Sequence, residues 1–197
     1  MIYTKEDLKE YLRCDKIALR NGNQKRPRWG RDEIWRFEIL LRKVEYYTNG
    51  PKTVINKILY LYYKYRFHKL SVKLGFSIPV NVFGKGLSIA HYGSIVVNNM
   101  AQVGENCRIQ ENVTIGSTGG STKAPKIGSN VFIASGARII GDIEIGDQCA
   151  IGANAVVTKS FLEQHVTIAG VPAKIISRNG SDGFIYEEVK VQKKMRK

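Results

Sequence analysis

The chain has 197 residues, 43% of them hydrophobic, with a formal net charge of +14. This length suits one globular unit with an appendage rather than two large domains. No apolar run approaches the roughly 20 residues needed to cross a bilayer, and the first ten residues lack the apolar core of a signal peptide. We therefore expect a cytoplasmic protein.

The positive charge is concentrated in the first part of the chain. Residues 1–75 carry 18 Lys and Arg against 8 Asp and Glu, whereas residues 76–180 carry 8 against 6. Such a segment favours anionic partners, among them acidic lipid, anionic glycan and nucleotide phosphates. The segment contains no known nucleic-acid-binding motif, so its charge is the only feature that would support binding to nucleic acid. We therefore expect no nucleic-acid partner.

Three helices are predicted within residues 1–75. Thr4 and Asp7 resemble a capping box at the start of a helix over about 4–20. Asp32 is a candidate N-cap for a second helix, which has one apolar face formed by Ile34, Phe37, Leu41 and Val44. A third helix is predicted from Thr53 to Leu74, before Gly75.

The third predicted helix is dense in aromatic and cationic residues. Its central sequence reads KILYLYYKYRFHKL. One interpretation is that its Ile and Leu side chains pack on the following domain or on a neighbouring subunit while Lys and Arg are solvated. The other is a peripheral contact with an anionic membrane through Tyr, Lys and Arg.

From residue 97 the apolar residues recur with a period of six. The row comprises Val97, Val103, Ile109, Ile115, Ile127, Ile133, Ile139, Ile145, Ile151 and Val157. Three residues after most of them stands Asn, Asp or Gly, the types that tolerate tight corners and positive φ. Neither an α-helix nor an alternating strand has this period. The row predicts a mainly β fold, a parallel β-helix whose coils bury their apolar rows against one another.

Two departures from the repeat draw attention. Phe83, Ile89 and Ile95 are two residues out of phase with the later row, which indicates an irregular first coil. Counted from Ile89, His91 points outward, where an imidazole needs no buried partner. The Gly-, Ser- and Thr-rich segment 116–125 stands where the row lacks one apolar residue, between Ile115 and Ile127. It predicts a protruding loop of the kind that carries binding functions.

The pattern divides the chain into three parts. We predict a basic helical region over 1–75, the β-helix over 76–178 and a polar tail over 179–197 that is a mobile cap or disordered. Cys14, Cys107 and Cys149 are odd in number, and two of them occupy small inward positions of the repeat. Buried reduced thiols are therefore expected rather than a disulfide or a metal site.

Residues 76–178 resemble the hexapeptide-repeat acyltransferases. The resemblance is carried by the repeat rows, by GKGLSIAHYGSIVV, by VTIG at 113–116, by IGANAVVTK at 151–159 and by AGVPAK at 169–174. The layout is closest to the serine O-acetyltransferases and their sugar-acetylating relatives in polysaccharide gene clusters. The resemblance implies a left-handed parallel β-helix, a homotrimer, acetyl-CoA as co-substrate without a metal, and active sites between subunits.

The resemblance assigns His91 as the catalytic base, because residues 91–97 resemble the family motif His-x-x-Gly-Ile-Val-Val, with the departure that Ser94 stands between Gly93 and Ile95. The chemistry agrees, since acetyl transfer from a thioester to a hydroxyl needs a base of near-neutral pKa. Backbone N–H groups of a coil edge are candidates to stabilise the oxyanion. Glu111, one coil on, is a candidate to orient the imidazole, and a backbone carbonyl would serve equally well.

The resemblance also assigns residues that line acetyl-CoA. By their place in the motifs, these are Ser135, Ala153, Thr158, Lys159 and Lys174. The alternative for Ser135 and Ala153 is that they are simply coil residues of suitable size.

The acceptor is judged from departures from the serine acetyltransferase pattern. Ala90 replaces the Asp before the catalytic His, Lys123-Ala124 replaces an Arg-His pair, and an orienting Asp aligns with Phe76. We therefore expect a sugar hydroxyl of a cell-surface polysaccharide or its lipid-linked precursor. Candidate acceptor contacts are Tyr92, Asn98, Asn112 and Lys123. The alternatives are serine O-acetylation in cysteine biosynthesis and a non-catalytic scaffold.

Overall fold

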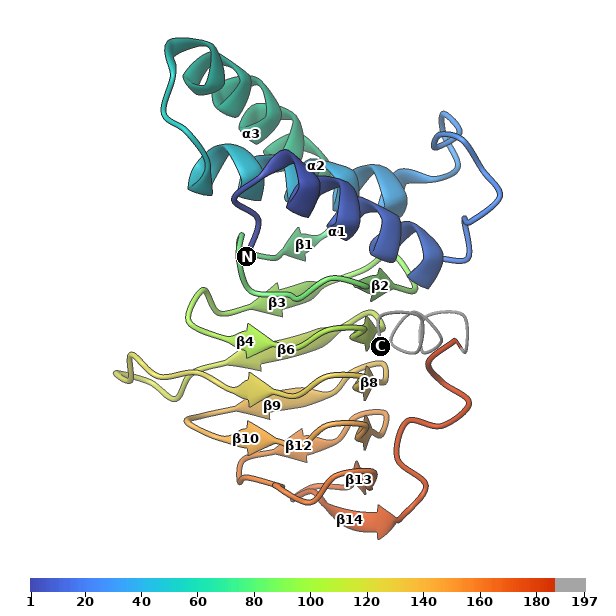
Figure 1. Ribbon diagram of the computed structural model, residues 1–197. Helices are drawn as coiled ribbons and strands as arrows, with labels where there is room; N and C mark the ends of the chain where they lie inside the picture. Colours follow the sequence, from blue (N-terminus) through green and yellow to red (C-terminus); the bar gives the residue numbers. More distant parts are fainter. Residues whose placement is uncertain (187–197) are drawn as a thin grey trace.

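A computed structural model describes residues 1–186 and consists of three helices stacked on one end of a left-handed parallel β-helix (Figure 1). The helices are α1 (Lys5–Ala18), α2 (Glu33–Asn49) and α3 (Val54–Leu74). The predicted capping box of α1 is present, with the Thr4 hydroxyl accepting from Asp7 N. Asp32 stands at the N-cap of α2 but makes no capping bond, because its carboxylate instead accepts from the backbone and guanidinium of Arg28.

Short strands build the β-helix, with three faces joined at three edges. The strands are β1 (Phe76–Ser77), β2 (Ser88–Ile89), β3 (Ile95–Val97), β4 (Gln102–Val103), β5 (Arg108–Ile109), β6 (Val113–Gly116), β7 (Lys126–Ile127), β8 (Phe132–Ile133), β9 (Arg138–Ile140), β10 (Glu144–Ile145), β11 (Ala150–Ile151), β12 (Val156–Val157), β13 (Thr167–Ala169) and β14 (Lys174–Ser177). The first face has the order β1-β3-β6-β9-β12, the second β4-β7-β10, and the third β2-β5-β8-β11-β13-β14. Within residues 1–186, only the last pair, β13 with β14, is antiparallel.

The six-residue row forms the core of the prism. All ten residues of the row are at most 5% exposed. Strand pairing places them in columns; on the third face, for example, Ile109 stacks on Ile133 and Ile133 on Ile151. Burying each such side chain contributes about 1.5–3 kcal/mol, so the repeat itself supplies most of the driving force for this part of the fold.

The predicted corners adopt the left-handed backbone conformation. Positive φ angles occur at Asn106, Asn112, Asn130, Gly136, Gln148 and Asn154. At the coil after the protruding loop the positive φ lies at Gly141 rather than at the expected Asp142. Asn106 and Asn130 also bond to each other through their side-chain amides at 3.0 Å, so one corner residue stabilises the next coil.

The phase shift in the first coil arises from two extra residues at one corner. Ile89 pairs with Ile109 and Ile95 pairs with Val113. From Ile89 to Ile95 the chain advances six positions, whereas from Ile109 to Val113 it advances four. The two extra residues lie between the third and first faces, in the segment that contains His91, and they push this segment out of the regular coil.

The helices dock on the first coil through a buried charged cluster. The fully buried guanidinium of Arg42 pairs with Asp15 at 2.7 Å and Glu45 at 3.0 Å, and donates to the carbonyl oxygens of Phe83 and Gly84. Asp15 in turn accepts from two backbone N–H groups of the same coil. Because a buried charge is costly unless it is paired and hydrogen-bonded, this set fixes α1 and α2 to the β-helix.

The tail packs on the β-helix in its described part. Ser181 and Ile185 are buried, and the guanidinium groups of Arg20 and Arg108 lie 3.4 and 4.4 Å from the centre of the Tyr186 ring. Residues 181–186 thus pack as a cap, one of the two alternatives that the sequence offered. The mobility of the tail stays a prediction, and residues 187–197 lie outside the described residues. Among the described residues, no helix is long and apolar enough to span a membrane.

The burial predicted for the three cysteines is confirmed. Cys14, Cys107 and Cys149 are all buried. Burial raises the pKa of the Cys107 thiol to about 12. This keeps it in the neutral, unreactive form.

Candidate functional site

Four of the candidate residues stand on one edge of the prism, where the third face turns into the first. His91, Glu111, Ser135 and Ala153 each follow by two residues the isoleucine of a third-face strand, and those strands pair in register. We call this line the His91 edge. His91 itself is exposed, as the count from Ile89 predicts.

A carboxylate lies directly beneath the His91 segment. Glu111 Oε1 accepts a 2.5 Å hydrogen bond from the Ser135 hydroxyl, whereas its Oε2 is shielded from solvent and has no hydrogen-bond partner. The Ser135 bond lowers the pKa of Glu111, and nearby His91 acts in the same direction. Gly93 is needed here, because a Cβ at that position would stand 3.1 Å from Glu111 Cβ. The edge thus holds an ionised carboxylate close to the imidazole.

Lys174 extends the His91 edge at the far end of the prism. Lys174 pairs with Ala169, which is one residue past the isoleucine of β13 and so stands at the same corner. From His91 on the β2 coil to Lys174 on β14 the edge therefore crosses five strand-to-strand steps, a distance of about 24 Å at roughly 4.8 Å per step. Small residues, including Ser135 and Ala153, occupy the middle and a cation the end. This arrangement fits an extended thioester substrate with terminal phosphates.

The other predicted contacts lie on a different edge. Thr158 and Lys159 follow β12, and Lys123 ends the loop that follows β6, so these residues stand where the first face turns into the second. Lys123 Nζ pairs with Asp142 at 2.7 Å, and Lys159 lies over the Phe161 ring. Within one copy, the short strands of the first face separate this edge from His91.

The predicted acceptor contacts are divided in the same way. Tyr92 adjoins His91, and its hydroxyl donates to the Arg31 carbonyl at 3.4 Å. Asn112 adjoins Glu111, but its oxygens accept from Arg138. Asn98 bonds Ser117 Oγ at the other edge. Of these residues, Tyr92 combines exposure with a place beside His91.

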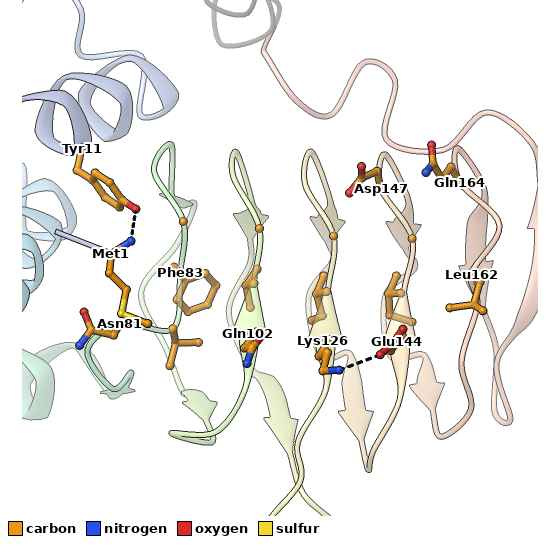
Figure 2. Close-up of a pocket in the computed structure, with 18 of the residues that line it drawn as sticks. Met1, Tyr11, Asn81, Phe83, Gln102, Lys126, Glu144, Asp147, Leu162 and Gln164 are labelled. Carbon is orange, nitrogen blue, oxygen red and sulfur yellow. Dashed lines mark hydrogen bonds and ion pairs between the residues drawn. The ribbon is translucent and has the colours of Figure 1, made fainter. Parts of the chain in front are cut away.

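A groove of about 590 Å³ runs over the second face, away from the His91 edge. It follows β4, β7 and β10 from the Met1 amino group to Leu162 and includes the Lys126–Glu144 ion pair (Figure 2). None of the sequence-predicted site residues lines it. We therefore place the candidate chemistry at the His91 edge, not in this groove.

Sequence reasoning missed the Ser135–Glu111 hydrogen bond and the buried Arg42 cluster. The first was detectable, because positions 111 and 135 hold the same phase of the repeat. The second had a weaker signal, namely Glu38, Arg42 and Glu45 at helical spacing beside the apolar face of α2. Among the described residues, there is no group of three His, Cys, Asp or Glu that could hold a metal ion.

Comparison with known proteins identifies the repeat. Residues 124–159 match the family model described as bacterial transferase hexapeptide (six repeats). The serine acetyltransferase of Salmonella typhimurium is 40% identical over 106 residues, which cover 53% of this chain and 38% of the relative. That of Staphylococcus aureus is 38% identical over 104 residues, covering 52% and 48%. The curated relatives are thus matched over less than half of their length.

A solved structure extends the likeness to the helices. The serine acetyltransferase of Brucella abortus in complex with coenzyme A is 29% identical, with a TM-score of 0.69. The superposition covers 89% of this chain and 70% of that one. The likeness therefore includes more than the β-helix, and with the repeat match it supports the left-handed fold that the sequence predicts.

Proposed function

The β-helix of this chain is built from the hexapeptide repeat of bacterial transferases, and from that premise we propose that the protein is an acetyl-CoA-dependent O-acetyltransferase. One observation carries the proposal. An exposed histidine begins a line of small residues that ends in a cation, with Ser135, Ala153 and Lys174 in order along one edge. The related enzyme from Brucella abortus binds coenzyme A, which has the extended shape and terminal phosphates that such a line suits.

The chemistry requires a base and a proton carrier at the same place. The His91 imidazole removes the proton of the acceptor hydroxyl as its oxygen attacks the thioester carbonyl. The tetrahedral oxyanion is stabilised by backbone N–H groups of the edge. When the intermediate collapses, the C–S bond breaks and the imidazolium returns its proton to the departing thiolate. Glu111 stabilises the imidazolium through its negative charge.

We propose L-serine as the acceptor. Both curated relatives described above and the solved structure are serine acetyltransferases, and the likeness to the solved structure covers 89% of this chain. The sugar acceptor expected first from the sequence has no counterpart among them. It therefore becomes the second candidate.

A specific observation keeps the sugar hydroxyl as that second candidate. A zwitterionic acceptor needs a carboxylate for its ammonium group, but Ala90 precedes His91 and Glu111 has one oxygen bonded to Ser135 and the other shielded from solvent. A neutral polyol would not need such a partner. Tyr92, which is exposed beside His91, offers it a hydroxyl.

We further propose that a second copy of the chain completes the site. Lys123, Thr158 and Lys159 lie on the other edge of the first face from His91. The residues of these two edges therefore cannot contact the same substrate molecule within one copy of the chain. A neighbouring copy that presents this edge to His91 would unite them. This is the arrangement that the resemblance implies for a homotrimer.

Thiol release from acetyl-CoA, followed with L-serine and separately with a panel of free and lipid-linked sugars, tests the proposal. Turnover on serine with O-acetylserine as the product supports the first acceptor. Turnover on a sugar but not on serine replaces it with the second. Absence of acceptor-dependent thiol release with either class leaves the scaffold interpretation and overturns the enzymatic one.

A further inference from the structure

Helix α3 has two apolar faces, and only one of them is covered. On the inner face, Phe67 stacks on Phe37 with ring centroids 5.2 Å apart, and Tyr63 stacks on Tyr47 at 5.5 Å. Leu74 is the only residue of α3 that is buried. The outer face exposes large apolar side chains at helical spacing: Val54, Ile55, Ile58, Leu61, Tyr62, Tyr65 and Val72. We call these seven residues the outer stripe.

The outer stripe is bordered by cations. At 3.6 residues per turn, Lys57 and Lys64 fall along one border and Arg66 and Lys73 along the other, with Lys69 within the stripe. The helix contains no Asp or Glu. Among the described residues, no carboxylate comes within salt-bridge distance of Lys57, Lys64, Arg66 or Lys69, and only Lys73 has a partner, Glu33.

The loop before α2 extends this surface. Trp29 is 83% exposed, and the Arg36 guanidinium lies 4.3 Å from its ring centre. Trp29 and Arg36 line a depression of about 430 Å³ together with Arg66, Lys69 and Lys73 of α3. An exposed Trp among cations is typical of protein segments that reside at the boundary between water and lipid.

We propose that the outer stripe and Trp29 bind the surface of an anionic lipid bilayer. The apolar side chains enter the boundary between headgroups and acyl chains, and the bordering Lys and Arg pair with lipid phosphates. Exposed apolar patches of this kind mark interaction sites. A lipid surface supplies both the apolar layer and the negative charge that this face needs.

Charge favours a bilayer over a second copy of the chain. If two outer stripes packed together, each would bring its bordering cations against those of the other without a carboxylate from either helix. Such like-charge contacts oppose association. The bilayer also leaves the rest of the molecule accessible, because α3 lies at the end of the molecule opposite β14 (Figure 1).

Cosedimentation of the full chain with vesicles tests the proposal. We expect binding to vesicles of phosphatidylcholine mixed with phosphatidylglycerol, little binding to phosphatidylcholine alone, and loss of binding at high salt. The double variant Ile58→Glu/Leu61→Glu changes two side chains that are more than 60% exposed, so the fold should persist. It should lower the vesicle-bound fraction by roughly tenfold.

Two further measurements make the test decisive. Ile176→Glu is the matched control, since it changes an equally exposed isoleucine on β14 and should bind as the wild type does. Trp35 is buried, so a blue shift of the tryptophan emission on vesicle addition reports Trp29. The proposal is overturned if the double variant binds vesicles as the wild type does, or if both lipid mixtures bind equally. It is also overturned if wild-type protein ignores vesicles while the double variant reduces the size of its assembly in light scattering.

Discussion

The Ser135 hydroxyl donates a hydrogen bond to Glu111 Oε1 across two successive coils of the His91 edge. This bond holds the Glu111 carboxylate in the layer beneath His91 and keeps its pKa below the usual range. Because the other oxygen is shielded from solvent, Glu111 acts on the reaction through the imidazole rather than through the substrate. It is a positioning residue in the proposed mechanism.

Replacing Glu111 by Gln keeps the shape of the side chain and removes its charge. We expect kcat to fall by about tenfold while the KM for acetyl-CoA stays the same, because the variant lacks the negative charge that stabilises the imidazolium formed as the hydroxyl attacks. Initial rates of thiol release at varied acetyl-CoA and acceptor concentrations measure both constants. A variant that keeps kcat and shows only a higher KM for the acceptor would place Glu111 in acceptor binding instead.

Replacing His91 by Ala removes the proposed base. We expect kcat to fall by about 10²–10⁴-fold while the KM for acetyl-CoA changes little, because general-base catalysis contributes to the transition state and not to thioester binding. His165→Asn is the matched control, since His165 binds Asp182 in a different part of the chain and its positive φ of 60° suits Asn. Equal activity of the two variants would contradict the assignment.

The sequence predicts the β-helix well because one local rule generates the whole domain. Each inward branched residue, such as Ile133, repeats after six positions, and each corner residue, such as Asn130, tolerates the positive φ that a tight corner requires. The same rule places Glu111, Ser135 and Ala153 on one edge, since they share a phase. The phase shift at Ile89 likewise has a local cause, the two extra residues of the His91 segment.

The docking of the helices is not predictable from such a rule. The face of α2 contains Phe37 and Leu41, as expected, but also the fully buried Arg42, which a helical pattern assigns to solvent. Its partners, the carbonyl groups of Phe83 and Gly84 and the carboxylate of Asp15, lie far away in the sequence. Because the contacts of Arg42 form only after the helices dock on the β-helix, the hydrophobic periodicity of α2 does not predict them.

Lys174 stands at the far end of the His91 edge and is exposed. Lys174→Ala should raise the KM for acetyl-CoA a few-fold without changing kcat, because an exposed charge contact contributes about 1 kcal/mol or less. With S-acetylpantetheine, which lacks the adenosine phosphates, the variant and the wild type should have the same KM. Lys126→Ala on the second face is the control. A kcat loss with the shortened thioester would show that Lys174 acts elsewhere.

The Glu38 carboxyl makes the stability of the helix–coil junction dependent on pH. It is fully buried, with Oε1 accepting from Ile89 N and Oε2 without a partner. Burial, and next the negative charge of Asp15, raise its pKa well above the usual range. Since the unfolded pKa is about 4.3, the folded state holds the proton more tightly, and this group's contribution to the free energy of unfolding falls as pH rises from about 4.

Glu38→Gln removes this titration and leaves an amide oxygen for Ile89 N. In urea unfolding between about pH 5 and 9, the free energy of unfolding of the wild type should decrease with pH more than that of the variant, and the variant should gain stability relative to the wild type at the alkaline end. Glu144→Gln makes the same chemical change on the exposed second face, where Glu144 pairs with Lys126. It should shift stability by less than about 1 kcal/mol at any pH. If the free energies of unfolding of the wild type and Glu38→Gln change with pH in parallel, the folding of the protein is not linked to titration of Glu38 in this range. The raised pKa of Glu38 is then wrong.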